Sequence, residues 1–296
     1  MRAPVPDGSG VDLELTDPGF DRFRRIIHET SRIALNDGKK ELLRSRVGKI
    51  LRRRGIGSFR EYLELVEEDR TGEELTVLLD AISTNHTFFF READHFRFLE
   101  ETVLPGLSAT RKDRGERKIR AWSAGCSTGE EPYSIAVTLL DRFRGGAGWD
   151  IRLLATDLST RVLAVARNGL YPSDRLKTVP QDVAARHFST ETGAGGERYY
   201  RVSTALRDLV TFGRLNLLEP YPFKGPFDFI FCRNVMIYFD GKTRETLVNG
   251  FHRYLADGGY LFIGHSESLN GIAHPFRYVR PSIYRKEAGA PGGKAG

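Results

Sequence analysis

The sequence predicts an α/β protein in which a small helical domain precedes a doubly wound, mostly parallel sheet. Apolar residues recur at helical spacing over residues 20–99. From residue 118 onward, apolar strand segments alternate with amphipathic helix segments. Residues 118–133 (KIRAWSAGCSTGEEPY) read as a strand that turns at Gly125 and Gly129 directly into a helix. A junction of this kind forms the ligand cradle at the carboxyl edge of an open sheet.

Length, charge and composition narrow the possible classes. A chain of 296 residues accommodates one large and one small domain. It has neither an apolar run of roughly 18 residues nor the apolar core of a signal peptide. Its two cysteines, Cys126 and Cys232, cannot form a disulfide framework, so we expect a cytoplasmic protein without membrane insertion. The net charge of +6 and pI of about 9.3 favour an acidic partner, such as nucleic acid, an anionic membrane or an acidic protein surface.

The N-terminal part is expected to have a disordered segment and then a helical domain. Residues 1–18 are rich in Pro, Gly and Asp and are predicted to be disordered, and the helical domain spans 19–87. Its periodic apolar positions are Phe20, Phe23, Ile26, Ile27, Leu43, Val47, Ile50, Leu51, Phe59, Tyr62, Leu63 and Val66. Gly55 is predicted to end the second helix.

The second helix, predicted over 39–54, is strongly basic. It carries eight basic residues and a single acid, Glu41. Arg46, Lys49 and Arg53 fall on the face opposite its apolar residues. One interpretation is an ordinary solvated face. The other is a docking surface for an acidic partner, because so many like charges on one helix oppose its stability.

Residues 88–99 are predicted to be a linker that lines the site. In the segment TNHTFFFREADHF, the three phenylalanines at 88–90 fit neither the helical nor the strand period. The segment is either a buried hinge or a linker in which Asn85, Thr87 and Arg91 supply polar groups to a site.

The sheet domain is predicted over 100–286, with a flexible tail at 287–296. Strands are expected at 118–125, 151–157, 227–234 and 260–266, followed by a final strand in FRYVRPSIYRK that runs antiparallel. Helices are expected at 130–143, 160–168 and 242–256, and turns at 145–148 and 257–259. Residues 172–207 break this alternation and predict an inserted antiparallel β-subdomain whose hairpin turns at ETGAGGE.

The residues around the cradle favour a ligand without phosphate. The glycines do not spell GxGxxG, and Glu130 and Glu131 stand where a pyrophosphate would rest on the helix N-terminus. Two carboxylates beside phosphates are electrostatically unfavourable, whereas S-adenosylmethionine offers ribose hydroxyls, an ammonium and a sulfonium. Asp157, at the end of the second strand, is placed to accept both ribose hydroxyls. Complementation of the helix dipole is the other explanation for the two glutamates.

Other chemistries compete for the same cradle. GCSTG matches the G-x-S-x-G nucleophile elbow, with Ser127 as nucleophile and His265 or His274 as partner, although the two glutamates would oppose an oxyanion. A regulatory module without chemistry is a further alternative. Metal-ligand spacings such as HExxH and CxxC are absent from the sequence, so no metal is expected. The two cysteines are interpreted as small buried residues.

Six segments together resemble the chemotaxis receptor methyltransferases of the CheR family. They are TNHTFFFREADHF, AGCSTGEEPYSIA, ATDLS, NLLE (216–219), FDFIFCRNVMIYFD and GHSESL, and they occur in the family's order over about 20–286. The resemblance implies a class I methyltransferase fold for the sheet domain, with the N-terminal helical domain and the small β-subdomain. It also implies an S-adenosylmethionine-dependent protein-glutamate O-methyltransferase that acts in chemotaxis and needs no metal.

The resemblance also assigns residues by motif. The cofactor-binding positions would be Asn85, Thr87, Arg91, Glu131, Asp157, Asn216, Leu217, Arg233 and Asn234. Arg91 and Tyr238 would lie near the transferred methyl group and act as the catalytic residues. The docking positions for the receptor would be Arg46, Lys49, Arg52 and Arg53.

The partner implied by the resemblance is the cytoplasmic helical bundle of chemoreceptors, bound by a monomeric enzyme. Some family members also bind a C-terminal receptor pentapeptide through the β-subdomain, and the loop ETGAGGE leaves that question open here. Methylation of nucleic acid is the nearest alternative, but the [ND]PP[YF] motif of amino-methylating DNA enzymes is replaced by RNVMIYF. We therefore expect no nucleic-acid partner.

Overall fold

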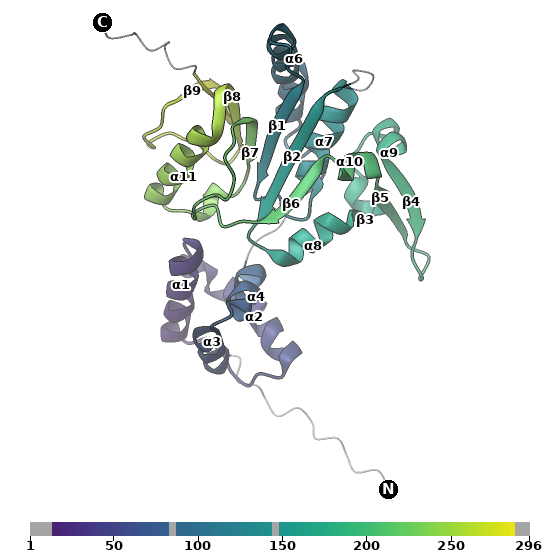
Figure 1. Cartoon of the computed structure of the whole chain (residues 1–296). Helices are drawn as coiled ribbons and strands as arrows, with labels where there is room; N and C mark the ends of the chain where they lie inside the picture. The colour runs from purple at the N-terminus through teal and green to yellow at the C-terminus, as the bar shows by residue number, and fades with distance from the viewer. Residues whose placement is uncertain (1–13, 83–86, 144–147, 288–296) are drawn as a thin grey trace, which may run out of the picture. The chain divides into compact units, whose positions relative to one another are not determined.

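The structure is a computed structural model that describes residues 14–82, 87–143 and 148–287. It divides into two compact units, residues 1–84 and 85–296 (Figure 1). The division falls slightly before the boundary expected after residue 87, so Thr87 belongs to the sheet unit. Asn85 lies outside the described residues. No helix in the described ranges is both long and apolar enough to cross a membrane.

The N-terminal unit is helical throughout its described residues. Its elements are α1 (Asp17–Ser31), η1 (Asp37–Lys39), α2 (Lys40–Arg54), α3 (Phe59–Glu68) and α4 (Glu73–Ile82). Phe23 and Tyr62, both fully buried, bring α1 and α3 together at a ring-centroid distance of 6.4 Å. Gly55 ends α2 as predicted, with φ of 69°, a left-handed conformation that glycine adopts without a steric penalty.

The predicted disorder of residues 1–18 is wrong for its last residues. Leu15 is 3% exposed and α1 begins at Asp17. Thr16 caps the helix, because its side chain accepts a hydrogen bond from the Gly19 amide at 3.2 Å. Leu15 and buried Phe20 occupy the two positions of a hydrophobic staple. The polar composition of this segment therefore concealed a helix start.

The second unit contains a seven-stranded sheet, which confirms the predicted fold class. The strand order is β6-β2-β1-β7-β8-β10-β9. The strands are β1 (Lys118–Ala124), β2 (Asp150–Asp157), β6 (Val210–Arg214), β7 (Phe227–Cys232), β8 (Leu255–Ile263), β9 (Phe276–Arg280) and β10 (Ile283–Lys286). β6, β2, β1, β7 and β8 pair in parallel, and β10 pairs antiparallel with β8, as predicted for the end of the chain.

Helices cover both faces of this sheet (Figure 1). They are α5 (Ala93–Phe98), the π-helical segment η2 (Leu99–Val103), α6 (Leu104–Asp113), α7 (Glu130–Phe143), α8 (Thr160–Asn168) and α11 (Gly241–Tyr254). Phe229 and Phe231 of β7 pack in one core layer with α5, η2 and α7. Ile230 and Cys232 of the same strand point to the opposite layer, which α11 covers.

Two expectations about individual elements are wrong, and one strand was not predicted. The segment 88–99 is not a linker to its end, because helix α5 begins at Ala93 and Phe96 is buried in the sheet core. Residues 257–259 are not a turn before the strand. They lie inside β8, where the pairing with β7 shifts register and Gly258 has φ of 79°. The edge strand β6 was not predicted, since its short sequence VTFGR contains only two large apolar residues.

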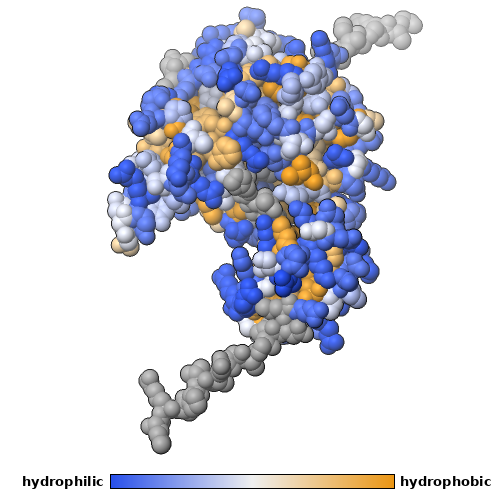
Figure 2. Space-filling view, turned by 180° about the vertical axis from the view of Figure 1, so that it is seen from behind, coloured by the Kyte–Doolittle hydropathy of each residue, from blue (hydrophilic) through white to orange (hydrophobic). Residues whose placement is uncertain are grey.

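The predicted β-subdomain is present as a separate three-stranded antiparallel sheet of order β3-β5-β4. The strands are β3 (Leu170–Pro172), β4 (Phe188–Thr192) and β5 (Arg198–Val202), with η3 (Ser173–Leu176), α9 (Gln181–His187) and α10 (Thr204–Arg207) beside them. β4 and β5 form the hairpin around ETGAGGE, where the Gly193 amide donates to the Glu197 carbonyl at 2.8 Å. Figure 2 shows a surface on which hydrophilic residues predominate and apolar residues form separate patches.

Candidate active site at the carboxyl edge of the sheet

The candidate site lies where the strand order of the sheet reverses. β1 pairs with β2 on one side and with β7 on the other, so the chain proceeds in opposite directions from this point. In open α/β sheets, the crevice outside the carboxyl ends of such strands is the usual ligand site. The residues that follow β1, β2, β6 and β7 are therefore the candidates for the ligand site.

The conformation of the loop after β1 requires glycine at two positions. Gly125 has φ of 84°, and an added Cβ would lie 2.4 Å from Cγ2 of Val235. Gly129 has φ of 98°, and an added Cβ would lie 2.6 Å from the Tyr171 hydroxyl. The amides of Gly125 and Cys126 both donate to the Thr156 carbonyl, at 2.8 and 2.9 Å. The loop is thus held close to β2 and to the segment after β7.

Asp157 stands at the end of β2, directly beside this loop. Its two carboxylate oxygens accept hydrogen bonds from the Ser127 amide at 2.8 Å and the Ser159 amide at 2.9 Å. Carboxylate oxygens accept hydrogen bonds, which is the chemistry that a ligand's hydroxyls require. The Leu215 amide donates to the Asp157 carbonyl at 3.0 Å, which brings the segment after β6, with Asn216 and Leu217, to the same edge.

Glu131, in the first turn of α7, lies behind the loop. Its Oε1 accepts from the Ser123 hydroxyl at 2.7 Å, and its Oε2 lies 3.2 Å from Nη1 of Arg233. Burial raises the pKa of Glu131, while the Arg233 guanidinium acts in the opposite direction. Its side chain is 12% exposed, and both carboxylate oxygens are bonded to protein groups.

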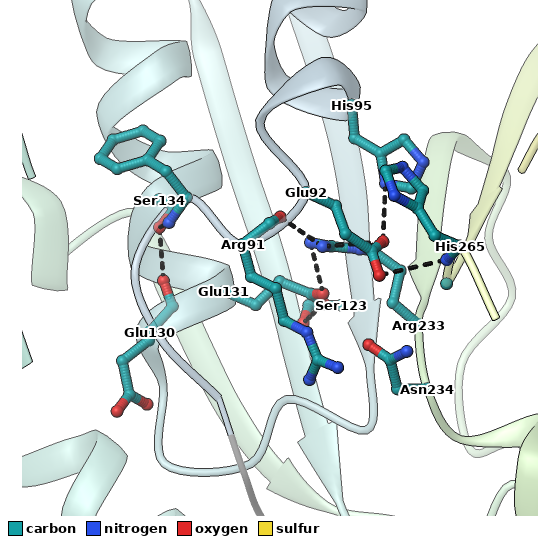
Figure 3. Close-up of polar contacts among 12 residues, drawn as sticks. Arg91, Glu92, His95, Ser123, Glu130, Glu131, Ser134, Arg233, Asn234 and His265 are labelled. Carbon is teal, nitrogen blue, oxygen red and sulfur yellow. Dashed lines mark hydrogen bonds and ion pairs between the residues drawn. The ribbon is translucent and has the colours of Figure 1, made fainter. Parts of the chain in front are cut away.

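Arg233 connects the three segments that form the rear of the site (Figure 3). Besides Glu131, its guanidinium binds the carboxylate of Glu92 with contacts of 3.1 and 3.0 Å and donates to the Arg91 carbonyl. The side chain is 1% exposed and lies over the rings of Phe96 and Phe231. The structure therefore places Arg233 behind the pocket, where it holds other residues in position.

Glu92 is a site residue that the sequence analysis missed. It has φ of 58° and binds Arg233 through one oxygen, while the other accepts from the His265 amide at 3.1 Å. It therefore links the segment before α5 to the ends of β7 and β8. Its position in the motif is visible in the sequence, but its two partners are far along the chain, so no local pattern could have assigned it this role.

Glu130 is buried and bonded to other protein groups. It is 1% exposed, accepts from the Thr128 hydroxyl at 2.6 Å and lies 3.4 Å from Arg175 of the β-subdomain. Burial raises the pKa of Glu130, and the Thr128 hydrogen bond and the Arg175 charge oppose that rise. Arg175 also donates to the carbonyl of buried Thr87 at 3.1 Å, so this contact fixes the start of the described segment before α5.

Arg91, Asn234 and Tyr238 belong to two segments, the one before α5 and the one after β7. The Arg91 guanidinium points away from the cluster around Arg233 and lies 5.9 Å from the centroid of the Phe88 ring (Figure 3). Asn234 has φ of 59°, and Tyr238 ends the short helix η4 (Met236–Tyr238). Within residues 14–82, 87–143 and 148–287, four of the six non-glycine residues with positive φ lie in these segments or the glycine loop: Phe90, Glu92, Ser127 and Asn234. Such concentration of strained backbone is typical of functional sites.

The hydrolase alternative is not supported by the positions of its histidines. His265 packs its ring on the edge of His95 at a centroid distance of 4.9 Å, and its amide binds Glu92. His274 accepts from the Phe276 amide at 3.2 Å and packs against Tyr284. Cys126 and Cys232 are fully buried, as expected, and burial raises the pKa of both thiols well above its ordinary value.

One cluster within the described residues has the composition of a metal site. Potential ligand atoms of Glu92, His95 and His265 all lie within 4.8 Å of one another. The Arg233 guanidinium already binds this carboxylate, however. Burial and the charges of Arg233 and Arg280 lower the pKa of His95 to about 3. The same positive potential disfavours a second cation at this place.

The docking residues expected on α2 divide into two groups. Arg46 is half-buried, and its Nη1 donates to the carbonyls of Ala81 and Ile82 at 3.2 and 2.8 Å. It caps the end of α4, which corrects its assignment to a free surface. Lys49, Arg52 and Arg53 are exposed, and no ion pair within the described ranges of the chain involves them.

Comparisons with known proteins identify relatives over most of the chain. Residues 85–284 match the family described as CheR methyltransferase, SAM binding domain, and residues 18–83 match CheR methyltransferase, all-alpha domain. A chemotaxis protein methyltransferase from Borreliella burgdorferi is 40% identical over 278 residues, which cover 93% of this chain and 96% of the relative. The proteins of the same name from Salmonella typhimurium and Escherichia coli are 40% and 39% identical over 274 residues, covering 92% of this chain and 91% and 92% of the relatives.

Proposed function

The chain belongs to the CheR methyltransferase family, and from that premise we propose that it methylates glutamate side chains of chemoreceptors with S-adenosylmethionine. The observation that carries the proposal is the pair of acids at the cradle. Glu131 and Asp157 flank the loop that Gly125 opens. Their negative charge suits the ribose hydroxyls and the cations of this cofactor and opposes a pyrophosphate.

The residues present fit the cofactor. Asp157 carries the carboxylate oxygens that ribose hydroxyls require as acceptors, and its contact with the Ser127 amide places it beside the glycine loop. Thr87, Arg91, Glu131, Asn216, Leu217 and Asn234 complete the proposed binding set, together with Asn85, which lies outside the described residues. Arg233 contributes by holding Glu131 and the Arg91 backbone.

The acceptor is already reactive in its ordinary form. A glutamate side chain has a pKa of about 4.3, so it is ionised near neutrality and needs no general base. The bound cofactor supplies a methyl group activated by its sulfonium. The protein therefore has to align the carboxylate oxygen with that methyl group, and alignment of this kind is worth about 7–11 kcal/mol.

Arg91 and Tyr238 are the residues to which we assign this alignment. The Arg91 guanidinium orients the incoming carboxylate, since its planar fork matches the two oxygens. Tyr238, which ends η4 beside the segment after β7, positions or shields the methyl group. Neither role needs a change of protonation state.

The receptor partner is proposed to dock on α2. Lys49, Arg52 and Arg53 form an exposed basic face suited to the acidic helical bundle of a chemoreceptor. The β4–β5 hairpin is the proposed site for a receptor C-terminal pentapeptide in those receptors that carry one. The enzyme is proposed to act as a monomer, without a metal and without nucleic acid as substrate.

The test is radiolabelled methyl transfer from S-adenosylmethionine to receptor-containing membranes. The expected product is base-labile, because methyl esters hydrolyse where methylamines do not. Arg91→Ala should lower turnover about 100-fold and lower the affinity for adenosylhomocysteine far less. Arg97→Ala is the matched control, since this α5 side chain is 62% exposed and forms a local ion pair with Asp94.

Two results would count against the proposal. A base-stable product would indicate a nitrogen acceptor. Labelling of nucleic acid, together with a salt-dependent mobility shift, would move the protein to another class of substrate.

A further inference from the structure

The segment after β7 carries two proposed site residues in an irregular backbone. Asn234 adopts φ of 59°, Val235 returns to the right-handed helical region, and residues 236–238 form the single turn η4. Consecutive residues of this kind direct several amides toward one point rather than into a ladder. Their amides need an acceptor, because unpaired buried amides cost free energy.

Glu267 supplies that acceptor. Its Oε2 accepts from the amides of Asn234 at 2.9 Å and Gly264 at 2.6 Å. Its Oε1 accepts from the amides of Met236 at 2.7 Å and Ile237 at 3.3 Å. Within the described residues, every partner of this carboxylate is a backbone amide. Burial raises the pKa of Glu267, and the four amides oppose that rise.

Packing confines the same segment from two sides. Val235 lies against the glycine loop so closely that a Cβ on Gly125 would come within 2.4 Å of it. On the other side, a Cβ on Gly264 would lie 2.5 Å from Nδ2 of Asn234. The segment therefore has little room to move sideways, and the Glu267 carboxylate sets its position between the two glycines.

We propose that Glu267 is a positioning residue for methyl transfer, which acts through the backbone of residues 234–237 on Asn234 and Tyr238. This inference rests on the proposed function. Loss of the carboxylate shifts Tyr238 relative to the reacting groups, and a misplacement of about 1 Å can cost about 100-fold in rate.

The experiment uses Glu267→Gln and Glu267→Asp in the full-length enzyme. Glutamine has the same length, but its NH₂ group faces two amide donors. Aspartate keeps the acceptor character and is too short to reach both pairs of amides. For each variant we expect turnover on receptor membranes to fall about 10-fold to 100-fold. The affinity for adenosylhomocysteine should fall much less, and the apparent melting temperature shows whether the variant is folded.

A double-mutant comparison separates positioning from general stability. If Glu267 acts through Tyr238, the double variant Glu267→Gln/Tyr238→Phe should have about the same turnover as the less active of the two single variants. If Glu267 had a merely structural role, the fold-decrease in turnover of the double variant would equal the product of the fold-decreases of the two single variants. Glu245→Gln is the matched control, because Glu245 is an exposed glutamate on α11, the helix that follows this segment.

Each outcome has a distinct meaning. A wild-type enzyme that forms no ester rejects the proposed function and, with it, this inference. An active wild type with fully active Glu267 variants, or with losses that multiply, rejects only the role of Glu267. Failure of both variants to fold also rejects it, since Glu267 would then be a stabilising core group rather than a positioning residue.

Discussion

At the scale of single residues, the rear of the site depends on one guanidinium that serves two carboxylates. Arg233 and the side chains of Glu92 and Glu131 are 1%, 11% and 12% exposed. Removing one partner from such a buried group leaves an uncompensated charge, which is costlier than losing the attraction alone. The charge of Arg233 therefore matters for the site even though it lies behind it.

We predict that Arg233→Met lowers the free energy of unfolding by about 3–5 kcal/mol. Adding Glu131→Gln should recover part of that loss, because one unpaired charge is then removed. Denaturant unfolding measures both effects. Arg277→Met is the control, since this side chain is 69% exposed. Equal stability of Arg233→Met and the control would contradict the interpretation.

A second prediction concerns Gly125, where backbone conformation and space act together. Gly125→Ala should lose stability and cofactor affinity, because the new Cβ meets Val235 at 2.4 Å. Gly271→Ala isolates the effect of backbone conformation, since Gly271 has φ of 74° and nothing lies within 4 Å of an added Cβ. The control should cost about 1 kcal/mol without affecting adenosylhomocysteine binding, as measured by calorimetry. Similar binding by both variants would show that the loop tolerates the methyl group.

The sequence predicts the environment of a residue correctly where that environment is set by its immediate neighbours in the chain. Cys126 follows the apolar strand β1 and Cys232 ends the apolar strand β7, and both are buried as expected. Glu92 and Glu267 could not be found in this way, because their partners lie on other elements and each sits in a polar loop segment. Arg46 was misread because its helical position looked exposed, while its length lets it reach the end of α4.

At the scale of elements, α2 combines structural and interaction residues on one helix. Leu43, Val47 and Leu51 are fully buried, and Lys49, Arg52 and Arg53 are exposed. Since Arg46 caps α4, we assign the proposed docking to the other three basic residues alone.

The combined variant Lys49→Glu, Arg52→Glu and Arg53→Glu should therefore raise KM for receptor membranes at least 10-fold. KM for S-adenosylmethionine should not change. Wild-type activity should fall with salt, because exposed charges are screened, and the variant should lose this dependence. Arg60→Glu on α3 is the control, with a side chain that is 81% exposed. An unchanged KM would remove α2 from the docking surface.

Elements were predictable where the hydrophobic period extended over a full helix or strand. The helices expected at 130–143 and 160–168 begin and end at the residues found. β6 and the irregular start of β8 were not predictable in the same way. A five-residue edge strand has little periodicity, and a register shift depends on the neighbouring strand rather than on its own sequence.

At the scale of the whole molecule, the β-subdomain is joined to the sheet by charged contacts as well as apolar ones. Asp141 of α7 contacts Arg186 at 2.9 Å and buried His187 at 2.8 Å, both from α9. Burial alone would raise the pKa of Asp141, but the hydrogen bonds from Arg186 and His187 outweigh it, and the pKa is lowered.

We predict that this contact makes the stability of the fold depend on pH in the acid range. A lowered pKa means that the folded state binds the proton less readily than the unfolded state. Its stabilisation is therefore present above the ordinary aspartate pKa, near 3.8, and is lost as pH falls below it. Asp141→Asn should reduce stability by about 1 kcal/mol near neutrality and flatten the acid side of the profile. Thermal unfolding between pH 7 and about pH 3 measures both, and an unchanged acid slope would contradict the assignment.

The pairing of β1 has a consequence for biosynthesis. β1 meets β2 soon after it leaves the ribosome, but its other neighbour, β7, is translated only after the entire β-subdomain. The pairing of β1 with β7 must wait, whereas the helical unit, residues 1–84, is translated before β1 begins. We expect ribosome-stalled chains that end before residue 227 to acquire protease resistance in the helical unit alone. A nascent chain in this state is the one that chaperones would need to shield.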